Sequence, residues 1–342
     1  MSTRASEVPR RAVDVREAGD SDEPRILELL LGVFGRWPGG LAGVAPSEFF
    51  RWKHKDGVFG RSRLLIAELD GVIVGFTAYM PWRFRTGGKR MISARAVDLA
   101  VDGSYRRLGA SVAIRTAANY HLESDVGFIW GNPNEQSHPG GRTTGASDAA
   151  TILHFIRPGR QWMETLRRAR AKGRRTPEEM PIEAETAAEA LRDGPPVTAL
   201  LQAVPHDANR LSTDIDLDYL RWRYGHFDEY RAVTVRSGSE LLGMAIFRAR
   251  SHGPFWGSDI CELLVAGGSP RAVRRLIAAV RRSAPADFLS CASRSKAKAA
   301  AWGFMPSGRG TTLTTVPLRQ GLAPDPNGRD SWALSRGDLE ML

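Results

Sequence analysis

One short turn constrains the fold of this chain more than any other feature. Residues 106–111 are Arg-Arg-Leu-Gly-Ala-Ser, between an apolar run at 96–101 and a run of helical character at 111–120. A glycine turn from a strand into a helix leaves backbone N–H groups free at the positive end of the helix dipole. The two arginines add donors suited to phosphate oxygens. The segment therefore predicts an α/β unit with a phosphate or pyrophosphate site.

Length and composition describe an ordinary globular protein. The chain has 342 residues, of which 42% are hydrophobic and 25% charged, so about two domains are expected. There is no long uncharged apolar run, and residues 1–16 have no signal-peptide core. Cys261 and Cys291 lie in apolar runs and are expected to be buried thiols rather than disulfide or metal ligands. We expect a cytoplasmic protein with no bound metal and no membrane contact.

The net charge of +10 is concentrated in one region. Residues 157–175 hold eight cations and one acid, and acids follow from 178 to 189. We interpret this as a charged helical connector, residues 157–196, whose two helices are solvated or mutually paired. Gly194-Pro195-Pro196 is expected to end the second helix. A nucleic-acid partner is therefore not expected.

The remaining pattern predicts alternating strands and helices. Strands are expected at 13–16, 64–69, 72–79, 90–101, 126–130 and 149–156. Asp70-Gly71 is a strong signal for a two-residue hairpin between the second and third of these strands. Apolar residues at helical spacing between 26 and 33 predict the first helix. The expected fold class is α/β, with a mixed, mostly antiparallel sheet flanked by helices.

The second half of the chain repeats the first weakly. Residues 220–224 are similar to 50–54, and the spacing from tryptophan to glycine is 23 residues in the first copy and 21 in the second. Three further matches follow in the same order: 233–235 and 241–247 with 64–69 and 73–76, then 260–265 with 97–101, then 300–304 with 144–146. Four ordered matches predict a duplication. The domains expected are residues 1–156, the connector 157–196, and residues 197–342.

The two copies differ at the turn. Where the first copy has its arginine-glycine segment, the second has Gly-Gly-Ser-Pro-Arg at 267–271. Proline lacks an N–H donor. We therefore expect only the first half to hold the phosphate ligand.

The turn and its flanks resemble the GNAT superfamily, the GCN5-related N-acetyltransferases. The family signature, Arg/Gln-x-x-Gly-x-Gly/Ala, is matched from Arg106 onward, with Ser111 as a departure in its last position. The segment at 98–105 is similar to the family's fourth strand, and 15–30 to its opening strand and helix. The resemblance covers residues 13–156 well and 197–320 faintly. It implies a tandem architecture of two GNAT-like domains with a degenerate second copy.

The resemblance implies an acyl-CoA cosubstrate, acetyl-CoA being expected, and no metal. Turn N–H groups would hold the pyrophosphate, and the main chain of Leu99 and Val101 would pair with the pantetheine arm. An amine would then attack the thioester directly, without an acyl-enzyme. The second half would wall the site of this acceptor amine or stabilise the first copy. The implied cofactor-binding residues are Leu99, Val101, Arg106, Arg107, Leu108, Gly109, Ala110, Ser111 and Asn134.

Three residues are candidates for catalysis. Asp98 interrupts an apolar strand, where burial would raise its pKa toward that of a general base; alternatively it is a structural acid bonded to a backbone N–H or to Arg95. Asn134, 11 residues before Gly145 as in the family, would bond pantetheine or substrate, or make a turn. His138 would line the acceptor pocket in the same loop.

The family's general acid is missing from its usual place. The family often has a tyrosine four residues before its conserved glycine, and here that position is Gly141. Tyr105, His138 or water would have to protonate the leaving thiolate. His54 and His121 are expected to be structural, as are four tryptophans, Trp52, Trp82, Trp130 and Trp222.

The expected function is acyl transfer to a primary amine of a small molecule or an amino sugar. One alternative is a transferase of the same fold that draws aminoacyl groups from charged tRNA. Another is a non-catalytic acyl-CoA sensor or scaffold. The oligomeric state is left open, with a homodimer as one option.

Overall fold

The structure is a computed structural model that describes residues 13–39, 41, 43–159, 162–163, 166–167, 181–253, 255–293 and 295–340. Most of the predicted connector lies outside these residues. Gly194-Pro195-Pro196 lies inside the described residues, and the prediction that it ends a helix is wrong. It begins helix α7 (Gly194–Ala203) rather than ending one, because proline is well tolerated in the first turn, where its missing N–H would have no partner.

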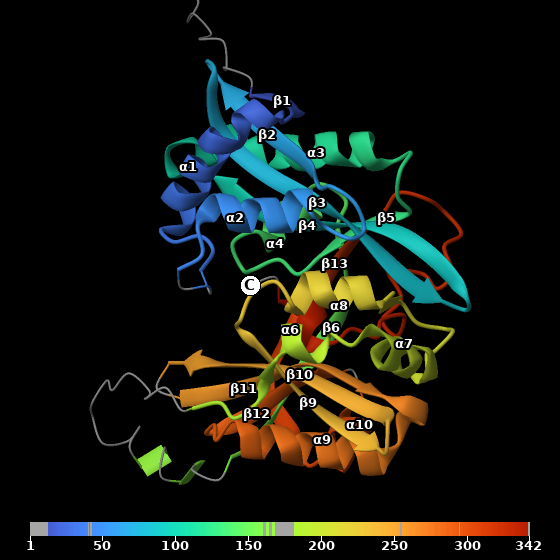
Figure 1. Cartoon of the computed structure of the whole chain (residues 1–342). Helices are drawn as coiled ribbons and strands as arrows, with labels where there is room; N and C mark the ends of the chain where they lie inside the picture. The colour runs from blue at the N-terminus through green and yellow to red at the C-terminus, as the bar shows by residue number, and fades with distance from the viewer. Residues whose placement is uncertain are drawn as a thin grey trace, which may run out of the picture.

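The chain folds into an upper and a lower half in the view of Figure 1. The strands of the first half are β1 (Asp14–Glu17), β2 (Arg63–Leu69), β3 (Val72–Thr86), β4 (Lys89–Val101), β5 (Phe128–Gly131) and β6 (Ser147–Pro158). Its helices are η1 (Asp20–Asp22), α1 (Glu23–Phe34), α2 (Pro46–Phe50), the π-helical turn η2 (Arg51–Lys55), η3 (Gly103–Leu108), α3 (Ala110–Leu122) and α4 (His138–Arg142). All six predicted strands of this half are confirmed, with shifted ends.

The second half follows the same plan. Its strands are β7 (Glu185–Thr186), β8 (Ser212–Thr213), β9 (Tyr230–Ser237), β10 (Glu240–His252), β11 (Phe255–Val265), β12 (Phe288–Ser293) and β13 (Met305–Pro317). Its helices are α6 (Ala187–Ala190), α7, α8 (Leu217–Tyr224), η4 (Ala266–Gly268), α9 (Pro270–Ser283), α10 (Lys296–Ala301) and α11 (Arg336–Leu339). No helix among the described residues combines the length and the apolar character needed to cross a membrane.

Within the described residues, thirteen strands form one sheet, in the order β1-β2-β3-β4-β5-β13-β6-β12-β11-β10-β9-β7, with β8 paired to β3. The pairs between these strands are antiparallel except β4–β5 and β11–β12, which occupy matching places in the two halves. The predicted mixed, mostly antiparallel fold class is confirmed. The two expected sheets are joined edge to edge, and the predicted domain limits remain a prediction.

The two halves exchange strands at the centre of the sheet. β13, from the end of the chain, pairs with β5 of the first half through residues 314–317. β6, from the first half, pairs with β12 of the second half through residues 153–158. β13 and β6 also pair with each other. Each half of the sheet is therefore completed by a strand from the other half.

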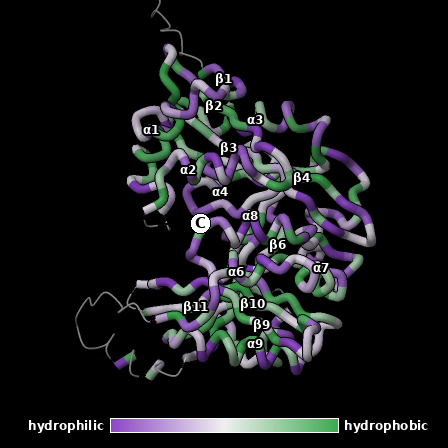
Figure 2. The backbone as a smooth tube through the Cα atoms, in the orientation of Figure 1, coloured by the Kyte–Doolittle hydropathy of each residue, from purple (hydrophilic) through white to green (hydrophobic). Residues whose placement is uncertain are grey.

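In each half, one long helix packs on the same face of the sheet. α3 packs on β2, β3 and β4 through Ile114 and Ala118, and α9 packs on β9, β10 and β11 through Leu276 and Val280. The apolar residues of α9 recur at the spacing that places them on one face of the helix. Figure 2 shows hydrophobic stretches around β10 and α9 beside hydrophilic ones.

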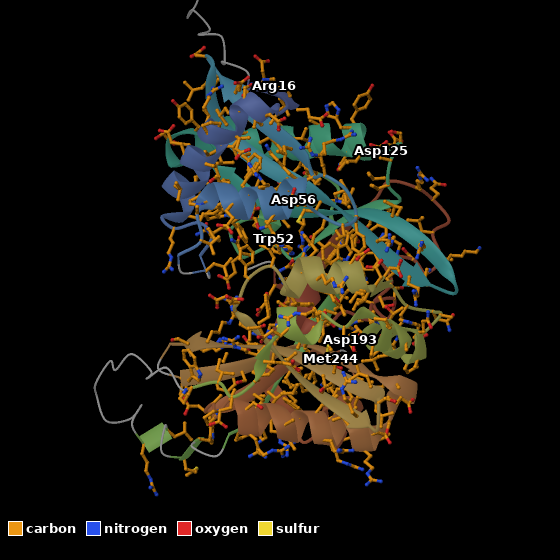
Figure 3. The ribbon with its side chains drawn as sticks, in the orientation of Figure 1. Arg16, Trp52, Asp56, Asp125, Asp193 and Met244 are labelled. Carbon is orange, nitrogen blue, oxygen red and sulfur yellow. The ribbon has the colours of Figure 1, made fainter. Side chains whose placement is uncertain are left out.

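The largest core cluster lies on the opposite face of the sheet, where the two halves meet. It contains the four tryptophans expected to be structural, and all four are buried: Trp52, Trp82, Trp130 and Trp222. Trp52 lies on the side of the first half that faces the second (Figure 3). The predicted buried thiols Cys261 and Cys291 are confirmed, each without a disulfide. A shared apolar interface of this size makes the halves one packed body.

Candidate functional site

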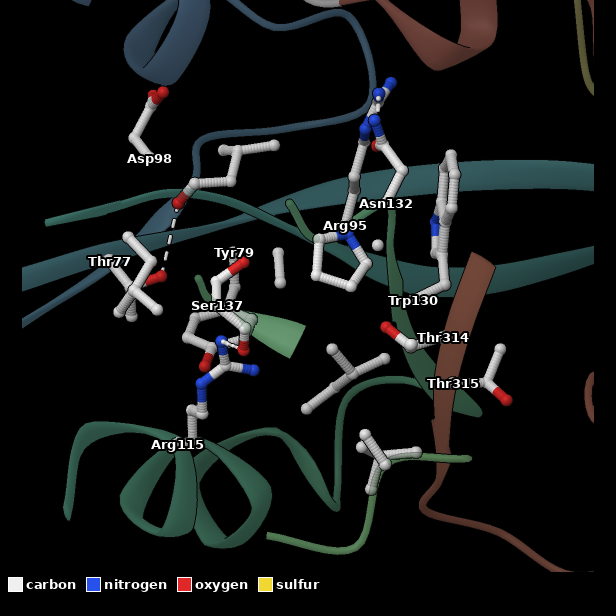
Figure 4. Close-up of a pocket in the computed structure, with 18 of the residues that line it drawn as sticks. Thr77, Tyr79, Arg95, Asp98, Arg115, Trp130, Asn132, Ser137, Thr314 and Thr315 are labelled. Carbon is white, nitrogen blue, oxygen red and sulfur yellow. Dashed lines mark hydrogen bonds between the residues drawn. The ribbon is translucent and has the colours of Figure 1, made fainter. Parts of the chain in front are cut away.

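Strands β4 and β5 separate after a short paired stretch. Only Ala94 and Arg95 of β4 pair with β5, opposite Ile129 and Trp130, although β4 continues to Val101. A cavity of about 290 Å³ lies at this opening. Figure 4 shows part of its wall. Because no described strand pairs with β4 beyond Arg95 on this side, its edge can accept an extended ligand in place of a strand.

The second half contributes to the wall of this cavity. Thr314 and Thr315 of β13 line it from the side of β5, and Leu339 of α11 lines it as well. Asn132, which follows β5, donates from Nδ2 to the Leu339 carbonyl at 3.0 Å. Residues of the second half thus form part of the cavity wall, and that this wall belongs to an acceptor site stays a prediction.

A bulge in β4 places Asp98 beside the opening. The β3–β4 register shifts between Phe76 and Ala78, so that Thr77 lies opposite two residues of β4. Asp98 has φ of +54°, an uncommon backbone conformation for a residue other than glycine. The Thr77 hydroxyl donates to the Val97 carbonyl at 3.2 Å, next to the bulge. Such strain persists only where surrounding contacts hold it.

Asp98 is held by two buried bases on the π-helical turn. The Lys53 ammonium and the His54 Nε2 lie 2.9 and 3.0 Å from its carboxylate. The other ring nitrogen of His54 is 3.1 Å from the Ser62 hydroxyl. Both basic side chains are at most 3% exposed. Sequence analysis missed this cluster, because nothing local links residues 53 and 54 to residue 98.

The contacts of Asp98 give its carboxyl a lower pKa than the sequence led us to expect. Burial by itself would raise the pKa of this carboxyl, but the charge of Lys53 and the hydrogen bond from His54 outweigh it and hold the pKa below its ordinary value. Burial lowers the pKa of His54, despite Asp98. The expectation of a raised pKa at Asp98 is therefore wrong. The alternative partner Arg95 is also wrong, because the ion-pair partners are Lys53 and His54.

The glycine turn has the predicted form. Gly109 has φ of +79° and precedes α3 without any side chain that caps the helix. Asp102 accepts from the Ser104 N–H at 2.8 Å and so fixes the start of η3. Arg106 is exposed, and Leu108 is 46% exposed. The first N–H groups of α3 are thus available to an anion.

The turn and the cavity are linked along α3. The cavity wall includes Arg115 and Asn119 of α3, and Ser111 lies one helical turn before Arg115. The side chain of Arg107 lies outside the described part of the chain. Leu99 lines the cavity, whereas Val101, Arg106 and residues 108–111 do not.

The second half differs from the first at the start of its covering helix. Pro270 is the first residue of α9, and the Ser269 hydroxyl accepts from the Ala272 N–H at 3.4 Å, which caps the helix. β11 and β12 pair only through residues 257–259 and 288–290, and α11 packs against both strands near this second opening. A cavity of about 270 Å³ lies at this second opening, so the difference between the halves is the capped helix start. That only the first half holds a phosphate ligand stays a prediction.

The remaining sequence candidates lie in different places. Asn134 lines the cavity, but its Oδ1 accepts from the Ser137 N–H at 2.9 Å, as expected for the turn-making alternative. His138 does not line the cavity; its Nε2 lies 2.6 Å from Asp148. Tyr105 packs with the apolar cluster under α3 rather than in the cavity. The structure thus brings Asp98, Leu99 and Asn134 together and leaves His138 outside.

Tyr79 and Arg115 are cavity residues that sequence analysis missed. Burial raises the pKa of Tyr79 to about 12, so its phenol is protonated at neutral pH. Arg115 donates to the Ser137 carbonyl at 3.1 Å and anchors the loop after β5. An arginine in an apolar stretch of helix and a tyrosine in a buried strand are the signals that could have identified them.

Comparison with known proteins gives a result at the level of the fold. No model of a protein family matches the chain. No curated protein matches it in sequence. Among solved structures, it is similar to a probable N-acyltransferase of Enterococcus faecalis V583, described as a conserved protein of unknown function, with a TM-score of 0.65 and 13% identity. The alignment covers 90% of this chain and 73% of that one.

Two further structures agree. A GCN5-related N-acetyltransferase from Anabaena variabilis has a TM-score of 0.63 and 14% identity, over 90% of this chain and 73% of that one. Eis1 from Mycobacterium abscessus has a TM-score of 0.56 and 15% identity, over 90% and 74%. The chain therefore has the fold of the GCN5-related N-acetyltransferases, as the resemblance in sequence implied.

Proposed function

We propose that this protein is an N-acyltransferase that moves an acyl group, acetyl in the first instance, from acyl-CoA to a primary amine. One observation carries the proposal: the opening between β4 and β5 adjoins the helix whose uncapped N-terminus follows the arginine-glycine turn. A cosubstrate with an anionic head and an extended arm matches an anion site followed by a free strand edge.

Different residues would bind the successive parts of acyl-CoA, from its pyrophosphate to its thioester. The N–H groups at Gly109, Ala110 and Ser111 would bind pyrophosphate, with Arg106 adding charge. The main chain of Leu99 and Val101 would hydrogen-bond the pantetheine arm. The thioester would then lie at the bulge near Asp98, where the amine approaches from the side of the second half. Fixed positioning of the two reactants is the main contribution.

The chemical step needs two proton transfers. The amine nitrogen attacks the thioester carbonyl carbon, the C–N bond forms, and the C–S bond breaks. The amine proton leaves to water or to Asp98, whose lowered pKa makes it a weak base. The thiolate takes a proton from Tyr79, the tyrosine that lines the cavity. Tyr79→Phe is expected to lower kcat while leaving acetyl-CoA affinity within about threefold.

Two measurements test the proposal. Calorimetric titration with acetyl-CoA should show binding that Arg106→Ala and Gly109→Pro weaken strongly, while the exposed Arg236→Ala leaves it unchanged. A thiol-release assay over a panel of small-molecule amines and amino sugars should find an acceptor that speeds release. Absence of acetyl-CoA binding would refute the proposal.

A non-catalytic acyl-CoA sensor is the second candidate. Two observations favour it: Gly141 occupies the place of the family's general acid, and Asp98 is already engaged by Lys53 and His54. If acetyl-CoA binds with the expected sensitivity at the turn but no amine speeds thiol release, the sensor is the better explanation.

A further inference from the structure

Arg95 is a buried cation in the wall of the cavity without an anionic partner among the described residues. It is 1% exposed, and its Nη2 donates to the Asn132 side-chain oxygen at 3.2 Å. Its Nε and Nη1 are buried without a hydrogen-bond partner in the part of the chain that the structure describes. A buried guanidinium left in this condition is costly. Packing alone therefore does not account for the burial of the Arg95 guanidinium, whereas a bound anionic ligand would.

Two tryptophan rings cover the guanidinium. Its central carbon lies 5.1 Å from the Trp82 ring centroid and 4.8 Å from that of Trp130. Cation–π contacts of this kind stabilise the charge without using its N–H groups. They fix the orientation of the group and leave donors for a planar acceptor. Figure 4 shows Arg95 beside Asn132 and Trp130.

The neighbouring carboxyls are engaged elsewhere. Asp98 is paired with Lys53 and His54. Asp338 accepts from the Thr213 hydroxyl at 2.7 Å, and burial raises the pKa of this carboxyl. Burial also lowers the pKa of Arg95 to about 10, against the pull of these two acids. The nearby carboxyls therefore do not fully balance the positive charge of Arg95.

Arg95 lies on the side from which the amine would approach. Its ring partners belong to the core between the halves, whereas Tyr79 and Ile129 of the same cavity belong to the cluster under α3. The proposed pyrophosphate site is at the start of α3. A ligand group that meets Arg95 is thus on the opposite face of the sheet from the nucleotide of CoA.

We propose that Arg95 is a specificity residue that binds a carboxylate on the acceptor, so that the preferred substrates are amines that also carry a carboxylate, such as amino acids. This inference rests on the proposed function. A carboxylate fits because a guanidinium edge binds its two oxygens in one plane. Among the described residues that line the cavity on this face, Lys53 is paired with Asp98, and Arg95 is the cation that remains for the ligand.

The test uses acceptors that differ only at the carboxylate. The full-length protein is assayed for thiol release with alanine, leucine and 4-aminobutyrate, each beside its carboxamide and the amine without the carboxyl group. Glucosamine serves as an acceptor without a carboxylate. The wild-type protein should favour at least one carboxylate by about ten- to a hundredfold in kcat/KM, as expected for a charge-assisted pair. This comparison needs no variant that has to fold.

The variants then assign the preference to Arg95. Arg95→Gln should reduce the ratio of carboxylate to carboxamide to about one, and Arg95→Lys should keep part of it. Arg236→Gln, an exposed arginine of β9, is the matched control and should leave the ratio unchanged. Thermal unfolding shows whether each variant is folded.

A second readout separates this inference from the proposed function. The same carboxylates and carboxamides are titrated calorimetrically into the protein with and without acetyl-CoA. If acetyl-CoA does not bind, the proposed function fails, yet carboxylate binding that Arg95→Gln abolishes still supports the site. If acetyl-CoA binds and neither binding nor rate distinguishes carboxylate from carboxamide, or the preference survives in folded Arg95→Gln, the inference is overturned.

Discussion

Trp52 and Trp222 hydrogen-bond each other's main chain. The indole N–H of Trp52 donates to the Trp222 carbonyl at 2.8 Å, and the indole N–H of Trp222 donates to the Trp52 carbonyl at 3.0 Å. Their rings are stacked, with centroids 5.2 Å apart. These residues belong to the first repeat match in the sequence, and the duplicated segments meet in a reciprocal pair.

Removing either indole N–H should destabilise the whole protein. Trp52→Phe and Trp222→Phe each leave a buried carbonyl without its donor, and each is expected to cost about 1–3 kcal/mol in the free energy of unfolding. The double variant should cost less than the sum, because the two bonds hold one contact. Urea unfolding provides the measurement.

Trp256→Phe is the control for this pair. Its indole nitrogen is buried without a hydrogen-bond partner in the described part of the chain. Loss of that N–H should therefore cost less than loss of either paired one. Equal losses at all three positions would show that ring size, and not the reciprocal bonds, sets the effect.

Gly109 should matter to binding more than to folding. Its φ of +79° strains any other residue, but there is open space around its Cα. Gly238 shares both properties, with φ of +58° in the second half. Gly109→Ala and Gly238→Ala should thus each lower stability by about 1 kcal/mol. Only Gly109→Ala should weaken acetyl-CoA binding, and calorimetry that finds equal affinities would contradict the assigned site.

Asp98 should act mainly through stability. Asp98→Asn leaves the Lys53 ammonium buried without its counter-ion, which is expected to cost about 3–5 kcal/mol. Adding Lys53→Met should recover part of that loss. In the folded fraction, kcat should stay within about tenfold of the wild-type value. A much larger loss of kcat with unchanged stability would instead make Asp98 the general base.

Glu262 should make stability depend on pH. Burial raises its pKa to about 8, and the Tyr224 and Ser335 hydroxyls donate to it at 2.7 and 2.8 Å. A carboxyl whose folded pKa is raised contributes stability below its unfolded value of about 4.3, and this contribution is lost as pH rises toward 8. Glu262→Gln should be more stable, relative to the wild type, at pH 8 than at pH 5.

Denaturant unfolding at pH 5, 6.5 and 8 measures this difference. Glu240→Gln, at an exposed glutamate of β10, is the control and should show the same pH dependence as the wild type. Parallel pH profiles for wild type and Glu262→Gln would contradict the assigned protonation.

Local patterns in the sequence predicted much of the fold. Alternating apolar residues, the Asp70-Gly71 hairpin and the glycine turn located β2, β3, β4 and α3, because each depends on neighbours in the chain. The exchange of β13 could not be predicted. This strand is rich in threonine and glycine, and its partner β5 lies nearly two hundred residues earlier.

The candidate site likewise has one part that local sequence predicts and another part that depends on distant segments. The anion-binding turn has a local signature, whereas the partners of Asp98 and the tryptophans around Arg95 come from distant segments. Composition gives no sign of which buried charges meet. The wrong pKa expectation at Asp98 followed from this, since burial was visible in the strand pattern and the buried counter-ion was not.

Because the two copies exchange strands, one copy cannot be lost in evolution without damage to the other. After a duplication, a copy that has lost its ligand can usually be deleted without harm to the other. Here deletion of the later copy would also remove β13, the neighbour of β5 and part of the wall of the surviving site. If the first copy performs the proposed chemistry, selection for that chemistry also retains the second copy, because the second supplies β13.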